Sequence, residues 1–274
     1  MSDRLPDRDH FDRPQAMTLL STLSAKLHHR PPPFDAEIWR RASADQAVLT
    51  TLPDAGREKL WALAHDFLRT RAINPVGGLA LENDARLRLA LLAALPVLEL
   101  GLNWYHGLHE VVVYPAGFAP QHNWTDECGI VHTERRALSG EAWNEGLLIV
   151  SWADVQAAAP LDGHHVVLHE CAHWLDMQAG AANGRPPLHP GMSAAEWTRV
   201  FTQAYAAFRH TPRHYPSLDP YAAEAPAEFF AVACEAFFEI PHALTRDFPA
   251  VYALLAALLR QDPRQRIAPL ENTP

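Results

Sequence analysis

The sequence is poor in cysteine, and what cysteine it has does not form a recognisable framework. Only three cysteines occur among 274 residues, at positions 128, 171 and 234, and no C-x-x-C pair is present. Small disulfide-stabilised domains and C-x-x-C zinc modules need paired cysteines at short spacing. The sequence therefore does not indicate a disulfide scaffold, and it is typical of a protein from a reducing compartment.

Long apolar runs are also absent. The longest, residues 87–102, contains Arg88, Pro96 and Glu99 and is too short to cross a bilayer. It is more typical of a buried helix pair or of one kinked helix. The first fourteen residues are charged and contain proline, without the apolar core of a secretory signal. We expect a cytoplasmic protein that does not bind membranes.

Positive charge is scarce. Lysine and arginine number 23 against 32 acidic residues, which gives a net charge of −9. A nucleic-acid-binding face needs clustered basic residues, so direct binding of nucleic acid is not expected. The hydrophobic share of 48% in a chain of this length is enough for a core that needs no disulfides or structural metal.

The chain divides by composition into four parts. Residues 1–33 form an expected flexible leader with one amphipathic segment, and they end in a run of three prolines. Residues 34–109 have helical spacing of apolar residues, residues 110–262 carry the chemistry described below, and residues 263–274 form a tail. We expect residues 34–262 to fold as one compact unit.

Secondary structure is expected to change from helices to strands and back. The segments 110–115, 129–133 and 146–152 are strand-like and are predicted to pair into one small sheet. Asn83 and Asp84 are candidate caps of a helix that begins near Ala85, and the predicted helices after the strands are 162–179, 193–209, 226–240 and 246–260. This order predicts an α+β fold that is mostly helical, rather than a βαβ series.

The segment that carries most chemical information is an H-E-x-x-H sequence, formed by His169, Glu170 and His173. On a helix, residues four apart lie on the same face, so both imidazoles can reach one metal ion. Glu170 projects about 100° around the axis from His169, where it can reach a water on the metal more easily than the metal itself. Two imidazoles, an open coordination position and a carboxylate base are what zinc-assisted peptide hydrolysis needs.

The surroundings of this segment fit a buried helix. Asp162 is a candidate N-cap and Gly180 a candidate C′ glycine, and the residues between them are mostly apolar. The alternative is that His169 and His173 are core histidines whose hydrogen bonds are satisfied within the protein. Cys171 lies between them in sequence, and we interpret it as core packing rather than as a fourth ligand.

A catalytic zinc needs a third protein ligand, and the best candidate is Glu228. Pro226 is placed to start a helix and Pro241 to stop it, which puts Glu228 in the first turn of an apolar helix. The alternative role for Glu228 is to stabilise the helix N-terminus by its charge.

Three further residues have two possible roles each. Glu235 lies two turns after Glu228, and it either orients a ligand histidine or forms a structural ion pair. Tyr221 either donates to the oxyanion of a tetrahedral intermediate or is an ordinary half-buried tyrosine. Asp176, one turn beyond His173, either accepts a hydrogen bond from a ligand imidazole or is solvated at the helix end.

Taken together, the residues resemble the Mlc titration factor A family, bacterial zinc peptidases whose catalytic domain is related to that of anthrax lethal factor. The matching stretches follow one another in family order and cover most of residues 34–262. They are FDAEIWRRA (34–42), LRLALLAALPVLELGLNWY (87–105), EVVVYPAGF (110–118), LSGEAW (138–143), IVSWADV (149–155), HECAHWLDMQAG (169–180), YAAEAPAEFFAVACEAFF (221–238) and FPAVYALL (248–255). Cys171, Trp174 and Cys234 depart from residues that are common in the family, and none of them is a proposed ligand.

The resemblance implies a zincin-like metallopeptidase with a small sheet next to the H-E-x-x-H helix, acting as an aminopeptidase or on longer peptides. It implies one Zn²⁺ per chain bound by His169, His173 and Glu228, with Glu170 as general base and Tyr221 as a transition-state donor. It also implies an alternative of another class, a regulatory protein that binds and titrates a transcriptional repressor with a partly structural zinc. The complete set of ligands and base favours the hydrolase, because a structural zinc would not need Glu170. If so, an extended substrate is expected along the exposed edge of one of the three predicted strands.

Overall fold

The N-terminal helices of the folded unit follow the spacing of apolar residues in the sequence. The computed structural model describes residues 30–116, 121–125, 131–135, 140–143, 146–211 and 214–269. From Phe34 onward the described residues belong to one compact unit, and the amphipathic segment predicted within residues 17–29 lies outside them. The first helices are α2 (Ala36–Ala42), α3 (Ala47–Thr50) and α4 (Asp54–Thr70). The carboxylate of Asp35 caps α2 by accepting the backbone N–H groups of Glu37 and Ile38.

The next helix, α5 (Asn83–Ala94), is a single helix rather than a pair. The prediction that Asn83 and Asp84 cap it is wrong, because the N-cap is Glu82 and both residues lie in the first turn. There Asp84 accepts a hydrogen bond of 2.7 Å from the guanidinium of Arg41. The helix ends just before Pro96, which has no N–H to continue the ladder and restricts the residue that precedes it.

The main sheet has four strands in the order β1-β2-β6-β5. Its strands β1 (Ala72–Pro75), β2 (Glu110–Tyr114) and β6 (Leu147–Ser151) are parallel, and β5 (Gly140–Trp143) runs antiparallel to β6. The strands predicted at 110–115 and 146–152 are thus confirmed, whereas β1 and β5 were not predicted. Because β1 is four residues long and contains Pro75, it carries no alternation that would mark it as a strand.

The prediction that the three strand-like segments pair into one small sheet is wrong. The predicted strand 129–133 corresponds to β4 (Val131–Arg135), which pairs with β3 (Gln121–Thr125) in a separate antiparallel sheet. In addition, β1, α5 and β2 form a βαβ unit, since parallel neighbours need a crossover connection. The strands 110–114 and 147–151 lie inside the sheet, so the edge strand beside the later helices is β5 instead.

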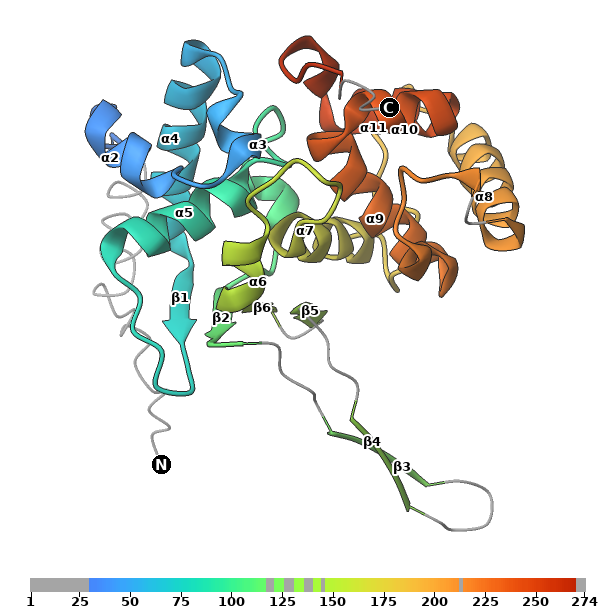
Figure 1. Ribbon diagram of the computed structural model, residues 1–274, viewed down its shortest axis with the longest axis horizontal. Helices are drawn as coiled ribbons and strands as arrows, with labels where there is room; N and C mark the ends of the chain where they lie inside the picture. Colours follow the sequence, from blue (N-terminus) through green and yellow to red (C-terminus); the bar gives the residue numbers. More distant parts are fainter. Residues whose placement is uncertain are drawn as a thin grey trace, which may run out of the picture. The chain divides into compact units, whose positions relative to one another are not determined.

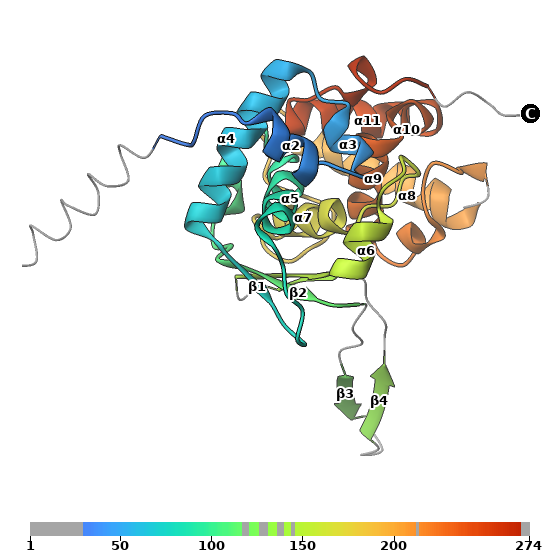
Figure 2. The same cartoon turned by 60° about the vertical axis from the view of Figure 1, so that its left-hand side comes forward.

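The remaining helices are packed against one another and against one face of this sheet. They are α6 (Trp152–Ala157), α7 (Val166–Met177), α8 (Ala194–His210), α9 (Pro226–Glu239), α10 (Pro241–Asp247) and α11 (Pro249–Leu259), with 3-10 turns at Leu102–Tyr105, Pro220–Ala223 (η3) and Pro263–Gln265. Figures 1 and 2 both show the helices on one side of the sheet. The described part of the chain is therefore mostly helical with a small, largely parallel sheet.

Helices α7 and α9 lie side by side at the centre of the unit (Figure 1). All residues from Phe229 to Glu239 of α9 are buried, including four phenylalanines. Burial of each such side chain stabilises the fold by roughly 1.5–3 kcal/mol, so α9 is held firmly in place. No helix in the described ranges is both long and apolar enough to cross a membrane.

Candidate metal centre

The helix that carries the H-E-x-x-H sequence is shorter than predicted. Helix α7 begins at Val166 with His165 as N-cap, and it ends at Met177 with Gln178 as C-cap. The predictions that Asp162 is the N-cap and Gly180 the C′ residue are therefore wrong. Asp162 instead accepts the backbone N–H of His164 within the turn before the helix. This turn is held by side chains of α9, which the local sequence pattern does not reveal.

The two histidines of α7 face the same point in space. His169 and His173 bring their Nε2 atoms to within 3.0 Å of each other, with their rings at 80°. Glu228 reaches them from α9, and its Oε2 lies 3.2 Å from each of these nitrogens. Two ligands of a tetrahedral zinc lie about 3.3 Å apart when each bond is about 2.0–2.1 Å. The donor set and its spacing thus fit a metal ion, as the mutual distances below 4.8 Å also indicate.

The position of Glu228 is compatible with both roles considered for it from the sequence. It lies in the first turn of α9, where Pro226 occupies the start of the helix. Its carboxylate nevertheless points to the two histidines rather than only to the helix end. The structure therefore brings the candidate third ligand together with the pair on α7, more than fifty residues away in sequence.

Burial and hydrogen bonding act in opposite directions on the titratable groups of this cluster. Burial by itself would raise the pKa of Glu228, but hydrogen bonds with His169 and His173 lower it to about 2. Burial by itself would lower the pKa of His169. The negative charge of Glu235, together with the hydrogen bonds that His169 makes with Glu228 and Glu235, instead raises this pKa well above its usual range. A metal must displace the proton on His169 in order to bind, so metal affinity is expected to rise with pH.

Glu235 lies behind the cluster and contacts the ring of His169. Its Oε1 is 2.8 Å from His169 Nδ1, and its Oε2 accepts the backbone N–H of His165. A proton held on Nδ1 by Glu235 would make Nε2 the nitrogen of His169 that a metal takes. The contact is compatible with both roles expected for Glu235, since it can orient the ring of His169 and is also an ion pair when His169 is protonated.

Asp176 matches neither role expected for it. It is fully buried, so it is not solvated at the helix end. Its oxygens accept the backbone N–H groups of Gly184 and Arg185 at 2.6 and 2.7 Å, and among the described contacts none joins it to a histidine ring. Asp176 fixes the loop after α7 by accepting two of its backbone N–H groups, of which that of the buried Gly184 would otherwise lack an acceptor.

Cys171 is packed inside the core. Its sulfur lies 3.8 Å from the carbonyl oxygen of Ala93, on the α5 side of the helix. Burial raises the pKa of its thiol to about 12, so the thiolate that a metal needs is not formed at neutral pH. The contacts agree with the interpretation of Cys171 as core packing.

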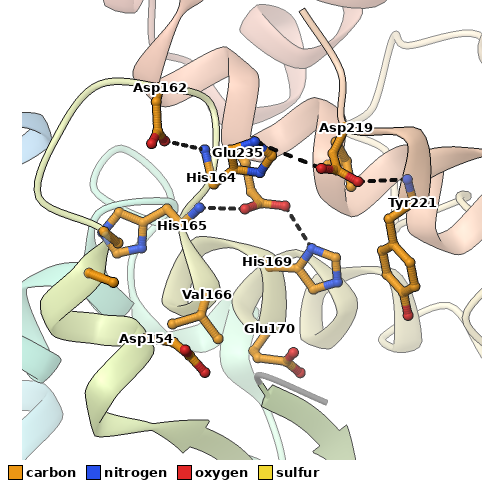
Figure 3. Close-up of a pocket in the computed structure, with 13 residues that line it drawn as sticks. Asp154, Asp162, His164, His165, Val166, His169, Glu170, Asp219, Tyr221 and Glu235 are labelled. Atoms are coloured by element: carbon orange, nitrogen blue, oxygen red, sulfur yellow. Dashed lines mark hydrogen bonds and ion pairs between the residues drawn. The ribbon is translucent and has the colours of Figure 1, made fainter. Parts of the chain in front are cut away.

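A cavity of about 470 Å³ opens beside the cluster. His169, Glu170, Glu235 and Tyr221 lie in its wall, as Figure 3 shows, whereas His173 and Glu228 do not. Glu170 is 2% exposed and follows His169 along α7. Tyr221 lies in η3, with its ring centroid 6.1 Å from that of His169.

The structure adds site residues that the sequence did not single out. His165 and Asp219 also line the cavity, and Asp219 caps the turn of Tyr221 by accepting its backbone N–H at 2.7 Å. Glu239 accepts the backbone N–H of Gly163, in the turn that leads into α7. The sequence does carry a signal for Glu239, which lies one turn after Glu235 on the same face of an apolar helix.

Comparison with known proteins agrees with this arrangement. The sequence matches the family described as glucose-regulated metallo-peptidase M90 over residues 21–260. It is 38% identical over 242 residues to Mlc titration factor A of Edwardsiella ictaluri (strain 93-146), which covers 86% of this chain and 92% of that protein. Proteins of the same name from Pectobacterium atrosepticum and Escherichia coli (strain K12 / DH10B) are each 36% identical, over 86% and 82% of this chain and 90% and 87% of the relatives. The resemblance found from sequence motifs is confirmed: the chain belongs to the Mlc titration factor A family, the glucose-regulated metallo-peptidases M90.

Proposed function

We propose that this protein is a zinc-dependent peptidase in which His169, His173 and Glu228 hold the metal. The observation that carries the proposal is the convergence of these three donors, at 3.0 and 3.2 Å, at the edge of a cavity that Glu170 also lines. Two imidazoles and one carboxylate leave a coordination position open, as catalytic zinc sites do. When bound, zinc supplies Lewis-acid polarisation of a carbonyl and lowers the pKa of a water to about 7.

Glu170 is the proposed general base. It is adjacent to His169 but lies off the face that His169 and His173 share, so it does not compete with them as a ligand. In this role its carboxylate accepts a proton from the attacking water and then passes it to the leaving amine. Glu170 lines the cavity, so a substrate bound there would lie beside it.

Tyr221 is the proposed donor to the oxyanion. Its ring lies beside that of His169 and lines the same cavity (Figure 3), while Asp219 fixes the turn that carries it. A phenol placed there can donate to the oxygen on which negative charge develops in the tetrahedral intermediate.

The lining of the cavity favours substrates with a free amino terminus. Its wall contains the carboxylates of Asp154, Asp162, Glu170, Asp219 and Glu235, and among the described residues that line it there is neither lysine nor arginine. An excess of carboxylates in a partly enclosed cleft attracts a cation such as the α-ammonium group of a peptide. The proposal is thus an aminopeptidase-like activity, with cleavage inside longer peptides as the alternative.

The test compares wild type with Glu170→Gln on aminoacyl chromogenic substrates and on the same substrates after N-acetylation. Gln keeps the size and hydrogen-bonding shape but cannot accept a proton, so we expect full zinc content and a loss of activity of about 10²–10⁴-fold or more. A chelator should abolish wild-type activity, and N-acetylation should reduce it. Loss of zinc in Glu170→Gln would instead make Glu170 a ligand, and unchanged activity would show that another base is used.

The name of the relatives supports a second candidate function. They are called Mlc titration factors, which implies that they bind the repressor Mlc. A protein that acts only by binding a repressor would do so equally well as wild type and as Glu170→Gln, without hydrolysis of any peptide. Zinc-loaded wild type that is inactive on all peptides but binds a repressor would favour this function.

A further inference from the structure

Helix α9 carries three glutamates on one face, and only two of them are explained by the metal cluster. Glu228, Glu235 and Glu239 are spaced seven and four residues apart, which keeps them within about 40° of each other around the helix axis. Glu228 contacts His169 and His173, and Glu235 contacts His169 and the backbone of His165. Glu239 lies furthest from the cluster, next to the turn before α7.

The contact of Glu239 is with the backbone of that turn. Its Oε2 accepts the N–H of Gly163 at 2.9 Å, and the residue is only 1% exposed. Asp162 and Glu235 are the charged groups that act on it, both of them negative, and among the described contacts no lysine or arginine is paired with it. Burial of a carboxyl group without a cationic partner destabilises the folded protein. The hydrogen bond with Gly163 offsets part of this destabilisation.

Gly163 is closely fitted to the end of α9. Its φ of +94° lies in the left-handed region, and a Cβ atom added to it would lie 2.8 Å from Cδ1 of Ile240, the residue that follows Glu239. The backbone at Gly163 therefore packs directly on α9. Two residues later, His165 is the N-cap of α7 and donates its own N–H to Glu235.

These contacts connect the two halves of the metal cluster. One face of α9 holds the third candidate ligand at one end and fixes the start of α7 at the other, and α7 carries the remaining two ligands. Since a helix is stiff over its length, the position of residues 163–165 sets where His169 stands relative to Glu228.

We propose that Glu239 is a positioning residue of the metal site, which fixes the start of α7 through Gly163 and thereby the spacing between His169 and Glu228. This inference rests on the proposed metal site but assigns Glu239 no contact with metal or substrate. It predicts that loss of the contact weakens metal binding although all three ligands remain.

The test uses Glu239→Ala and Glu239→Gln of the full-length protein, with Tyr252→Phe as control. Gln keeps an acceptor oxygen for the N–H of Gly163, whereas Ala removes it. Tyr252→Phe removes the part-buried hydrogen bond that Tyr252 donates to Asp262, and so destabilises the protein without removing a contact of the turn. Zinc affinity is measured by competition with a chromogenic chelator, and ligand geometry by the visible spectrum of the Co²⁺-substituted protein.

We expect Glu239→Ala to lower zinc affinity about 10-fold or more and to change the Co²⁺ spectrum, on the scale known for outer residues of metal sites. Glu239→Gln should restore both, and Tyr252→Phe should lower the melting temperature while leaving both unchanged. If Glu239→Ala does not fold, Glu239→Asp, which is one methylene too short to reach Gly163, should show the same weakening.

Wild-type zinc affinity and an unchanged spectrum in Glu239→Ala, or in Glu239→Asp where Ala does not fold, would overturn the proposal. An equal loss of zinc affinity in Tyr252→Phe would also overturn it, because the effect would then be general destabilisation. Failure of the peptidase proposal has a different signature, namely zinc-loaded wild type that hydrolyses no peptide.

Discussion

At the scale of single residues, two glutamates of helix α9 differ in charge: one is ionised and the other is neutral. Hydrogen bonds with two histidines lower the pKa of Glu228 to about 2, so it is ionised in the folded protein. Burial raises the pKa of Glu239 to about 9, and the nearby charges of Asp162 and Glu235 add to this effect. The first glutamate is therefore suited to hold a cation, and the second is a neutral hydrogen-bonding group at pH 7.

The raised pKa of Glu239 predicts how stability depends on pH. Its folded pKa of about 9 exceeds the ordinary value of 4.5, so between these values the unfolded chain has lost the proton that the folded chain still binds. Stability must therefore fall as pH rises through this range. Glu239→Gln has no such proton. We therefore expect the melting temperature of this variant, relative to that of wild type, to rise steadily from about pH 5 to pH 9.

The control for this prediction is Glu58→Gln, at an exposed glutamate of α4. The difference between its melting temperature and that of wild type should not change over the same range. A difference between Glu239→Gln and wild type that is flat with pH would mean that Glu239 is ionised in the folded protein.

Tyr221 allows a prediction about a single hydroxyl group. Removal of one donor to the oxyanion typically lowers kcat about 10²–10³-fold. We expect Tyr221→Phe to lose activity on this scale while keeping its zinc and its KM within a few-fold, as measured by steady-state kinetics and elemental analysis. Unchanged kcat would reduce Tyr221 to a packing residue beside His169.

At the scale of elements, the site depends on how two helices meet. Helix α7 supplies the histidines, α9 supplies the carboxylates, and the turn between Asp162 and His165 fixes their relation. The apolar side chains around α9 hold it rigidly in the core, so the turn is the element that a single substitution can disturb.

This predicts an unusual cost for Gly163→Ala. The methyl group would lie 2.8 Å from Cδ1 of Ile240, so the end of this buried side chain must shift, and the positive φ adds backbone strain. We expect a loss of about 1–3 kcal/mol in the free energy of unfolding, measured by urea denaturation. Gly78→Ala is the matched control, since Gly78 also has a positive φ, of +78°, but nothing lies within 4 Å of the added atom. Equal losses for both variants would show that the fit against Ile240 is unimportant.

At the scale of the whole molecule, a bound metal would connect segments that are far apart in the chain. The candidate ligands are residues 169, 173 and 228, so only the folded protein presents all three together. A ligand that binds the folded state alone stabilises it by about 2.7 kcal/mol at a concentration 100 times its Kd.

We therefore expect zinc to raise the melting temperature by roughly 5–10 °C, given about 2–4 °C per kcal/mol for a unit of this size. Glu228→Ala should lose most of this shift, and His210→Ala, at an exposed histidine at the end of α8, should keep it. A shift that persists fully in Glu228→Ala would indicate that zinc binds elsewhere.

The sequence by itself determined what depends on neighbours along the chain. The four-residue spacing puts His169 and His173 on one helical face, and Pro226 puts Glu228 in the first turn of a buried helix, because helical periodicity and proline geometry are local. The motifs in their order also sufficed for the family.

Tertiary structure decided what depends on distant contacts. From the sequence, Glu235 and Asp176 were equally good partners for a ligand histidine, and only the packing of α9 on α7 gave that contact to Glu235 and a loop to Asp176. The same holds for the strand at 131–135, which pairs outside the main sheet, and for Glu239, whose partner lies 76 residues away. Strand pairing and helix packing are settled by long-range burial, and periodicity records which face of an element is buried but not which element covers it.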